Sequence, residues 1–405
     1  MNLSKIYFPG LNGLRFFAAL AVIFTHMELM KQYLGLDHLW LDSGNRISEY
    51  AFAHVQRGEI HWAQPIFAEA GPLGVVFFFV LSGFLITYLL LAEKQLTKTV
   101  GVGAFYMRRI LRIWPLYFFI FILGFFVLPH FSFFEVGVQS EKFAENFWGN
   151  FWCYLFFLPN LAYSLYMAVP CIGHSWSIGV EEQFYLIWPV IMKFAKRPLK
   201  AILMVTGVLL LLKSGVLVLD KMSDANWIAP LKTFVAMSKI ECMTLGGLGA
   251  YILFYKKENI LRWIHSRTIQ IAAFAMIPFL LYFFPAKLQD GVHLLYSLCF
   301  LVIMMNVSGN KKSLVKLENN AMNLLGKISY GIYMYHLMCV VFVLHFFKYL
   351  NPGVEHLGMA NNILVYAAAI LLTIVVSYFS YHIFESRFIR MKKNLTRVLS
   401  GDEAR

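Results

Sequence analysis

The amino-acid sequence predicts an all-α membrane protein, a polytopic bundle of about ten transmembrane helices with both ends of the chain in the cytoplasm. Of the 405 residues, 59% are hydrophobic and only 14% are charged, and the mean hydropathy is +0.63. These proportions exclude a soluble domain of this length. The formal net charge of +13 therefore indicates orientation in a membrane, and we expect a lipid bilayer and no nucleic acid as a partner.

Ten apolar stretches are long enough to span a bilayer, which takes about 20 helical residues. They are residues 11–30, 72–92, 114–131, 176–195, 201–219, 235–255, 268–285, 292–308, 328–347 and 362–384. An eleventh stretch, residues 147–170, is also apolar, but Pro159 and Asn160 interrupt it and Pro170 ends it. Hydropathy alone does not decide whether this stretch crosses the membrane.

The positions of lysine and arginine decide the topology, because cytoplasmic connections carry an excess of both. With ten spans, alternate connections are basic, and those between them, such as residues 31–71 and 132–146, are acidic or nearly neutral. Counting residues 147–170 as a span would place every later basic connection outside. We therefore predict ten spans, both termini inside, and residues 147–170 as a re-entrant or interfacial segment on the outer side.

The predicted organisation is one transmembrane domain, residues 1–388, with residues 31–71 as its outer loop and residues 389–405 as a short basic cytoplasmic tail. The first apolar stretch has no small-residue cleavage site and is expected to be retained. A multi-pass protein of the cytoplasmic (inner) membrane is the expected localisation. The five cysteines are scattered without a CxxC pair, so we expect no metal site.

Two ionisable side chains, Arg15 and His26, lie inside the first span. A charged group at membrane depth costs about 2.5 kcal/mol or more, so such a residue indicates a function. At about 100° and 1.5 Å per residue, the two share one helix face and lie roughly 16 Å apart along the axis. Arg15 is then expected near a membrane surface, and His26 well inside.

A second motif, residues 174–189, contains the adjacent carboxylates Glu181 and Glu182 in an otherwise aromatic and aliphatic span. Glu181 shares a helix face with Tyr185, whereas Glu182 points about 100° away, so the two acids are expected to have different tasks. The alternative is a pair of interfacial glutamates held at the headgroup level by Trp and Tyr. That alternative stays open for both acids, and it has more weight for Glu182.

Three arginines precede the third span: Arg108, Arg109 and Arg112. Arg108 and Arg112 share a helix face, and guanidinium groups there can bind phosphates in a bidentate manner. Ordinary contact with anionic lipid is the alternative. In another motif, Ser82-Gly83 interrupts an aromatic run, and we favour close helix packing over catalysis as its role. In residues 329–336, Tyr330, Tyr333 and His336 lie on one helix face.

Taken together, these motifs resemble acyltransferase family 3, membrane proteins that O-acylate sugars on extracytoplasmic glycans, antibiotics or related acceptors. The resemblance runs from Gly10 to Phe388, and Arg15 and His26 match the family signature of Arg, ten residues and His. It implies ten core helices, a donor acyl-CoA reached from the cytoplasm with no permanently bound cofactor, and Glu181 as the recurrent family glutamate. The family's usual terminal Glu-x-Pro reads Glu385-Ser386-Arg387 here, which leaves any role of Glu385 open.

The expected activity is therefore that of an O-acyltransferase, and acetyl transfer to a glycan or glycoconjugate is the leading hypothesis. We expect His26, Glu181 and Arg15 as catalytic residues, with His26 as general base, covalent acyl carrier or a shaping side chain. The arginines expected to hold coenzyme A are Arg15, Arg108, Arg109 and Arg112. Residues expected to support the substrate or the structure are Ser82, Trp176, Gln183, Tyr185, Tyr330, Tyr333 and His336.

The competing hypothesis is a proton-coupled transporter or flippase of an anionic or lipid-linked substrate. In that case His26, Glu181 and His336 would form a proton relay, and the arginines would bind the cargo.

Overall fold

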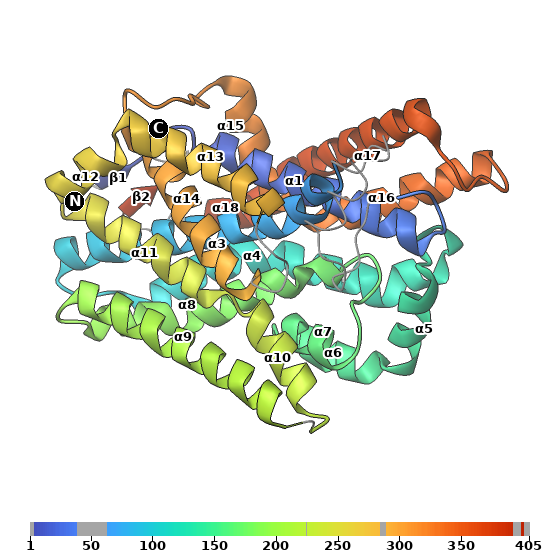
Figure 1. The fold of residues 1–405 in the computed structure, drawn as a ribbon, viewed down its shortest axis with the longest axis horizontal. Coiled ribbons are helices and arrows are strands. Elements are labelled where there is room, and N and C mark those ends of the chain that lie inside the picture. Colours follow the sequence, from blue (N-terminus) through green and yellow to red (C-terminus); the bar gives the residue numbers. More distant parts are fainter. Residues whose placement is uncertain (1–3, 39–62, 224, 284–288, 392–397, 401–405) are drawn as a thin grey trace.

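The computed structural model describes residues 4–38, 63–223, 225–283, 289–391 and 398–400. Over these residues the chain is a bundle of helices (Figure 1), which confirms the predicted all-α membrane class. The first half of the helices, in chain order, is α1 (Leu11–Tyr33), α3 (Gln64–Thr97), α4 (Val102–Ile122), α5 (Gly137–Glu145), α6 (Phe147–Leu155), α7 (Pro159–Leu165), α8 (Trp176–Phe194) and α9 (Pro198–Met222). The second half is α10 (Ile228–Met237), α11 (Ile240–Phe254), α12 (Glu258–Ile264), α13 (Arg267–Phe283), α14 (Gln289–Gly309), α15 (Asn320–Lys327), α16 (Ser329–Leu350), α17 (Gly358–Ser380) and α18 (Ser386–Met391).

Short π and 3-10 turns continue some of these helices. The π turns are η2 (Leu123–Val127) and η7 (Tyr381–Glu385), and the 3-10 turns are η3 (Leu128–His130), η4 (Ser132–Phe134) and η5 (Gly173–Ser175). Two strands of three residues, β1 (Ser4–Ile6) and β2 (Val398–Ser400), pair in parallel.

Seven helices of the described chain are long and apolar enough to cross a membrane, and α12 with α13, bent by 56°, makes an eighth if the pair is one span. Two other predicted spans fall on α8 and α11. Helix α8 carries Glu181, Glu182 and Lys193, and α11 has only 15 residues, so neither meets the same criterion. The number of ten crossings therefore stays a prediction.

One set of the connections between helices lies at a single end of the bundle, where hydrogen bonds and ring contacts join them. Glu318 accepts bonds from the Tyr7 hydroxyl and the Gly10 amide, both at 2.7 Å, and the Phe8 ring packs against Tyr88 near the end of α3. At the same end of α3, Lys94 donates to the carbonyl groups of residues 192, 193 and 195. All of these connections are ones that the charge pattern predicts to be cytoplasmic.

The other connections meet at the opposite end. The Asp37 amide donates to the Glu355 carbonyl at 2.8 Å, Lys348 donates to the Leu34 carbonyl, and the His345 ring bonds to the Glu135 carbonyl. These are connections predicted to be external. Figure 1 shows β1 and β2 at the left of the bundle and α5 at the right. The pairing of β1 with β2 brings the first and last described segments together. That both lie on the cytoplasmic side of a membrane stays a prediction.

The stretch at residues 147–170 forms two short helices, α6 and α7, of nine and seven residues. Both are far shorter than the roughly 20 residues that cross hydrocarbon. One face of α6, extended by Phe156, exposes Trp148, Trp152 and Phe156, and rings of this kind suit the boundary between water and lipid. The interfacial or re-entrant placement of the segment stays a prediction.

Helix α3 begins eight residues earlier than the predicted span, at Gln64, so residues 64–71 of the predicted outer loop are helical. Pro72 lies inside this helix, and a proline there weakens the backbone ladder. The Thr25 hydroxyl of α1 compensates locally, since it donates to the Phe67 carbonyl at 2.6 Å and accepts from the Gly71 amide at 2.7 Å. Most of the rest of the predicted loop, residues 39–62, lies outside the described residues.

Candidate active site

A cavity of about 150 Å³ lies between five helices, α1, α3, α4, α8 and α16. Its wall is largely apolar, with Val75, Phe78 and Phe79 among the lining residues. The polar and charged residues of the wall are Arg15, Ser82, Arg109, Arg112, Ser177, Glu181, Tyr185, Ser329, Tyr330 and Tyr333. Side chains from both ends of the sequence thus converge on one space, as in a ligand site, where a few polar groups fix the orientation of a bound molecule.

Three arginines line this cavity: Arg15 from α1, and Arg109 and Arg112 from α4. Arg109 and Arg112 are three residues apart and share a face of α4. Arg108 points elsewhere and forms an ion pair with the buried Glu93, with 3.1 Å between Nη2 and Oε2. The spacing in the sequence predicts that Arg108 and Arg112 act together on one helix face. In the structure, Arg109 and Arg112 are the two arginines of α4 that line the cavity.

Glu181 lies in the same wall and accepts a hydrogen bond of 2.5 Å from the Tyr185 hydroxyl, one turn further along α8. Ser82 of α3 completes the chain by bonding to that hydroxyl. The Arg109 guanidinium lies 5.7 Å from the centre of the Tyr185 ring, close to the glutamate. Glu181 thus balances part of the positive charge of the arginines, and its hydrogen-bond partner is Tyr185 rather than His26.

Glu182 points away from the cavity towards α4, where Trp114 Nε1 donates to it at 3.1 Å. The two adjacent acids therefore have different surroundings, as their spacing predicts.

A cluster of three histidines lies beyond the cavity. His26 Nδ1 and His336 Nε2 are 3.1 Å apart, and the ring centres of His174 and His336 are 4.5 Å apart. His174 is 2% exposed, and neither of its ring nitrogens has a hydrogen-bond partner among the described residues. Buried polar groups are normally paired, so this ring is suited to a bound ligand or water. His174 is not among the predicted site residues, although it begins the sequence motif that contains the two glutamates.

Tyr333 connects the cavity to the histidine cluster. Its ring lines the cavity, and its hydroxyl donates to the His174 carbonyl at 2.9 Å and bonds to Ser177 at 2.5 Å. Its own carbonyl oxygen lies 2.5 Å from Nδ1 of His336. Tyr333 therefore contacts both the cavity and the histidine cluster.

The remaining predicted supporting residues lie around this core. Tyr330 lines the cavity, and its hydroxyl donates to the Ile113 carbonyl at 3.0 Å. Trp176 packs edge-on against Phe79, and Gln183 bonds to Asn160 of α7, so these two side chains support the wall from outside. Glu385 is buried next to Ser380, whose hydroxyl donates to it at 3.3 Å.

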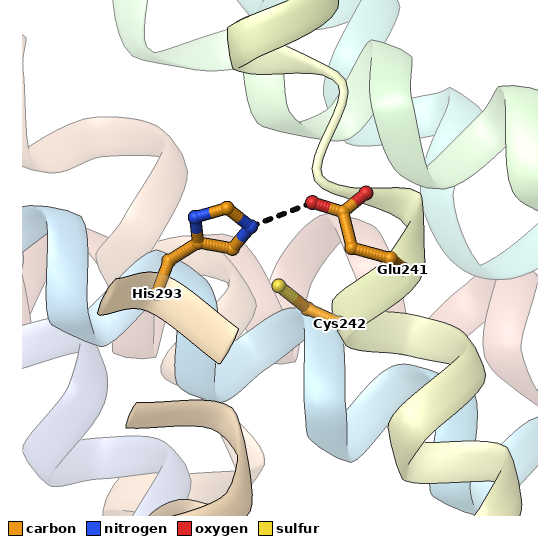
Figure 2. A group of neighbouring side chains, drawn as sticks. All are labelled: Glu241, Cys242 and His293. Carbon is orange, nitrogen blue, oxygen red and sulfur yellow. Dashed lines mark hydrogen bonds and ion pairs between the residues drawn. The ribbon is translucent and has the colours of Figure 1, made fainter. Parts of the chain in front are cut away.

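A second polar group, away from the cavity, consists of Glu241, Cys242 and His293 (Figure 2). Among the described residues it is the group whose donor atoms lie close enough together to hold a metal ion. However, Glu241 Oε1 already lies 2.7 Å from His293 Nε2 and 2.5 Å from Lys213 Nζ. The Lys213 ammonium group occupies the place that a metal cation would take. We therefore interpret Lys213, Glu241 and His293 as an ion-paired contact between α9, α11 and α14.

Comparisons with known proteins agree with the resemblance in the motifs. Residues 8–382 match the family model described as an acyltransferase domain. The chain is 26% identical over 396 residues to the O-acetyltransferase OatA of Staphylococcus aureus strain NCTC 8325 / PS 47, which covers 95% of this chain and 57% of the relative. It is also 26% identical over 395 residues to the putative O-acetyltransferase SACOL0978 of strain COL, with 94% and 57% covered. No solved structure matches.

The chain thus spans somewhat more than half the length of these curated relatives. The family match, in contrast, covers nearly all of this chain, from the residues before α1 to the turn after α17. It includes each side chain of the cavity wall and of the histidine cluster. This protein therefore belongs to the acyltransferase family.

Proposed function

We propose that this protein is a membrane O-acyltransferase that transfers an acyl group, acetyl in the first place, from cytoplasmic acyl-CoA to a hydroxyl of an extracytoplasmic glycan or glycoconjugate. The observation that carries the proposal is a cavity lined by three arginines, one of whose wall residues, Tyr333, contacts the buried histidine cluster. The names of the similar proteins, O-acetyltransferases, support acetyl as the group transferred.

The arginines are suited to the donor. Coenzyme A carries phosphate groups at one end and its thioester at the other, and guanidinium groups bind phosphates in a bidentate manner. The cavity of about 150 Å³ is smaller than the roughly 300–1,000 Å³ of a drug-sized ligand site. The narrow acyl-thioester arm would therefore enter it, while the phosphates would remain at the side of Arg15, Arg109 and Arg112.

His26 is suited to the chemistry. As the acceptor oxygen forms a bond to the thioester carbonyl carbon, the imidazole takes the hydroxyl proton. When the carbon–sulfur bond breaks, that proton passes to the thiolate, so the reaction needs no further reactant. The alternative sequence, in which His26 first accepts the acyl group on its ring, uses the same atoms in two steps.

The acceptor would approach from the opposite end. His26 lies seven residues, or about 10 Å, before Tyr33 at the end of α1, and the connections at that end are those predicted to be external. Donor and acceptor would thus meet inside the bundle from two sides.

A binding experiment tests the donor site. We compare acetyl-CoA affinity, by calorimetry of the purified protein in lipid nanodiscs, for the wild type and for the double variant Arg109→Ala, Arg112→Ala. Charge-assisted hydrogen bonds contribute about 1.5–3 kcal/mol each, so the dissociation constant should rise at least a hundredfold.

The matched control is Arg197→Ala with Arg262→Ala, which removes the same charge from exposed positions outside the cavity wall. The control should bind like the wild type. Equal affinity of both double variants and the wild type would refute a phosphate site at these arginines.

A further inference from the structure

The contact between His26 and His336 joins two helices that are distant in the sequence, α1 and α16. Nδ1 of His26 lies 3.1 Å from Nε2 of His336, and each ring also contacts a backbone carbonyl of its own helix. Those carbonyls are Val22 O, 3.0 Å from His26 Nδ1, and Tyr333 O, 2.5 Å from His336 Nδ1. A carbonyl oxygen can only accept a hydrogen bond, so these two contacts determine where the ring protons are.

The position of the ring proton can be assigned first for His336. Its Nδ1 faces the Tyr333 carbonyl and must carry a proton. In the neutral ring the lone pair is then on Nε2, the atom that faces His26. The neutral form is the one expected here, because His336 is fully buried and a buried cation would need a compensating charge.

The tautomer of His336 then determines the tautomer of His26. An Nδ1 lone pair would repel both the Val22 carbonyl oxygen and the lone pair on His336, so Nδ1 of His26 carries the proton. The proton is shared between the two acceptors, and the lone pair of His26 is left on Nε2. No described residue forms a hydrogen bond to that nitrogen in the structure.

We propose that His336 is a positioning residue: through the Nδ1–Nε2 bond it holds His26 in the tautomer whose Nε2 receives the proton of the acceptor hydroxyl. This inference rests on the proposed acyl-transfer function and adds the atom at which the proton is taken. When Nε2 is protonated, the bond from Nδ1 to His336 becomes charge-assisted and therefore stronger.

The acidic groups near His26 have other partners. Glu181 accepts from Tyr185, and Glu28, two residues after His26, is paired with Lys31 at 2.9 Å and accepts from the Tyr366 hydroxyl at 2.5 Å. His174 lies further off, with 6.3 Å between its ring centre and that of His26. A neutral histidine in place of the usual carboxylate also keeps the resting pair uncharged at membrane depth.

Two variants separate the hydrogen bond from simple packing. His336→Gln keeps an oxygen acceptor near the position of Nε2, whereas His336→Leu removes it and retains apolar volume. General-base catalysis contributes about 10²–10⁴-fold, so His336→Leu should lower kcat about a hundredfold or more, with KM for acetyl-CoA unchanged. His336→Gln should recover at least a tenth of the wild-type rate.

A spectroscopic measurement does not depend on activity. In protein labelled with ¹⁵N-histidine, the two ring nitrogens of His26, assigned by their loss in His26→Gln, report which of them carries the proton. We expect the proton on Nδ1 in the wild type and in His336→Gln, and a mixture of tautomers in His336→Leu. A wild-type proton on Nε2 overturns the proposal whatever the kinetics show.

The outcomes separate this inference from the proposed function. Wild-type acyl transfer with an equally active and folded His336→Leu overturns the positioning role alone. No acyl transfer by the wild type overturns the proposed function, while the spectrum still decides the tautomer. If His336→Leu does not fold, His336→Gln decides: a folded but inactive protein counts against the proposal.

Discussion

At the scale of single residues, two of the clusters of ionisable groups inside the bundle differ in the balance of their charges. The cavity cluster contains Arg15, Arg109, Arg112 and Glu181, so positive charge exceeds negative charge among these groups. The second cluster pairs Lys213 with Glu241, and His293 satisfies the same carboxylate oxygen. The first cluster has charge left over to bind an anion, whereas the second balances itself and holds helices together.

The second cluster gives a prediction about stability. Removing one member of a buried ion pair leaves an uncompensated charge and costs about 3–5 kcal/mol, whereas replacing both is much less costly. We expect Lys213→Met to lower the thermal midpoint strongly, and Lys213→Met with Glu241→Gln to restore most of it. Thermal unfolding in detergent, followed by tryptophan fluorescence, measures both.

Lys232→Met provides the matched control, since Lys232 pairs with Asp220 at 2.6 Å but remains partly exposed. Exposed pairs are worth about 0–1 kcal/mol, so this variant should be nearly neutral. A double variant as unstable as Lys213→Met would show that the pair does not act as a unit.

Some features of the candidate site were predictable from the sequence because their signal is local. Arg15 and His26 are ionisable groups within an apolar stretch, and the two glutamates diverge because adjacent helix positions differ by about 100°. The choice of Arg109 over Arg108 depends on where Glu93 lies, and the partner of His26 depends on α16. These are tertiary contacts between distant residues, which helical spacing does not encode.

At the scale of helices, the crossing of α3 and α11 supports the cavity. A Cβ atom on Gly83 would lie 1.8 Å from the Met243 carbonyl oxygen, and one on Gly246 would lie 2.0 Å from the Val80 carbonyl oxygen. Ser82, the neighbour of Gly83, faces the cavity and bonds to Tyr185. The Ser-Gly motif therefore serves packing through Gly83 and the site through Ser82.

A methyl group at this crossing should separate the helices. We predict that Gly83→Ala lowers the thermal midpoint and weakens acetyl-CoA binding together, because displacement of α3 also displaces Ser82. Gly207→Ala in α9 is the control, since its Cβ meets nothing within 4 Å and alanine favours a helix by about 1 kcal/mol over glycine. Normal stability of Gly83→Ala would contradict the close crossing.

At the scale of the whole molecule, the two ends of the bundle correspond to the two sides assigned by charge. Basic connections that the structure describes meet near β1 and β2, and acidic or neutral ones, at residues 34–37, 135 and 345–355, meet at the other end. The charge pattern predicts which end faces the cytoplasm because membrane insertion itself depends on it, and this orientation stays a prediction. The number of ten crossings stays a prediction, because α8 carries three charged side chains and α11 has only 15 residues, so neither meets the criterion of length and composition.

Cysteine labelling tests the orientation. Glu141→Cys, at the end predicted to be external, should react with a membrane-impermeant maleimide on intact cells, and Lys196→Cys should react only after the membrane is opened. Both positions are exposed, and the unsubstituted chain gives the background from native cysteines. Labelling of Lys196→Cys on intact cells would reverse the predicted sides.

The central claim is acyl transfer through His26 to an envelope hydroxyl. The most direct measurement is the alkali-labile acyl content of the host's envelope glycans, by NMR and mass spectrometry, in strains with the wild type, with His26→Ala or without the gene, at matched membrane abundance. We predict an ester present with the wild type and absent from the other two strains. Equal ester content in all three strains would contradict the claim and favour the competing hypothesis of a transporter or flippase.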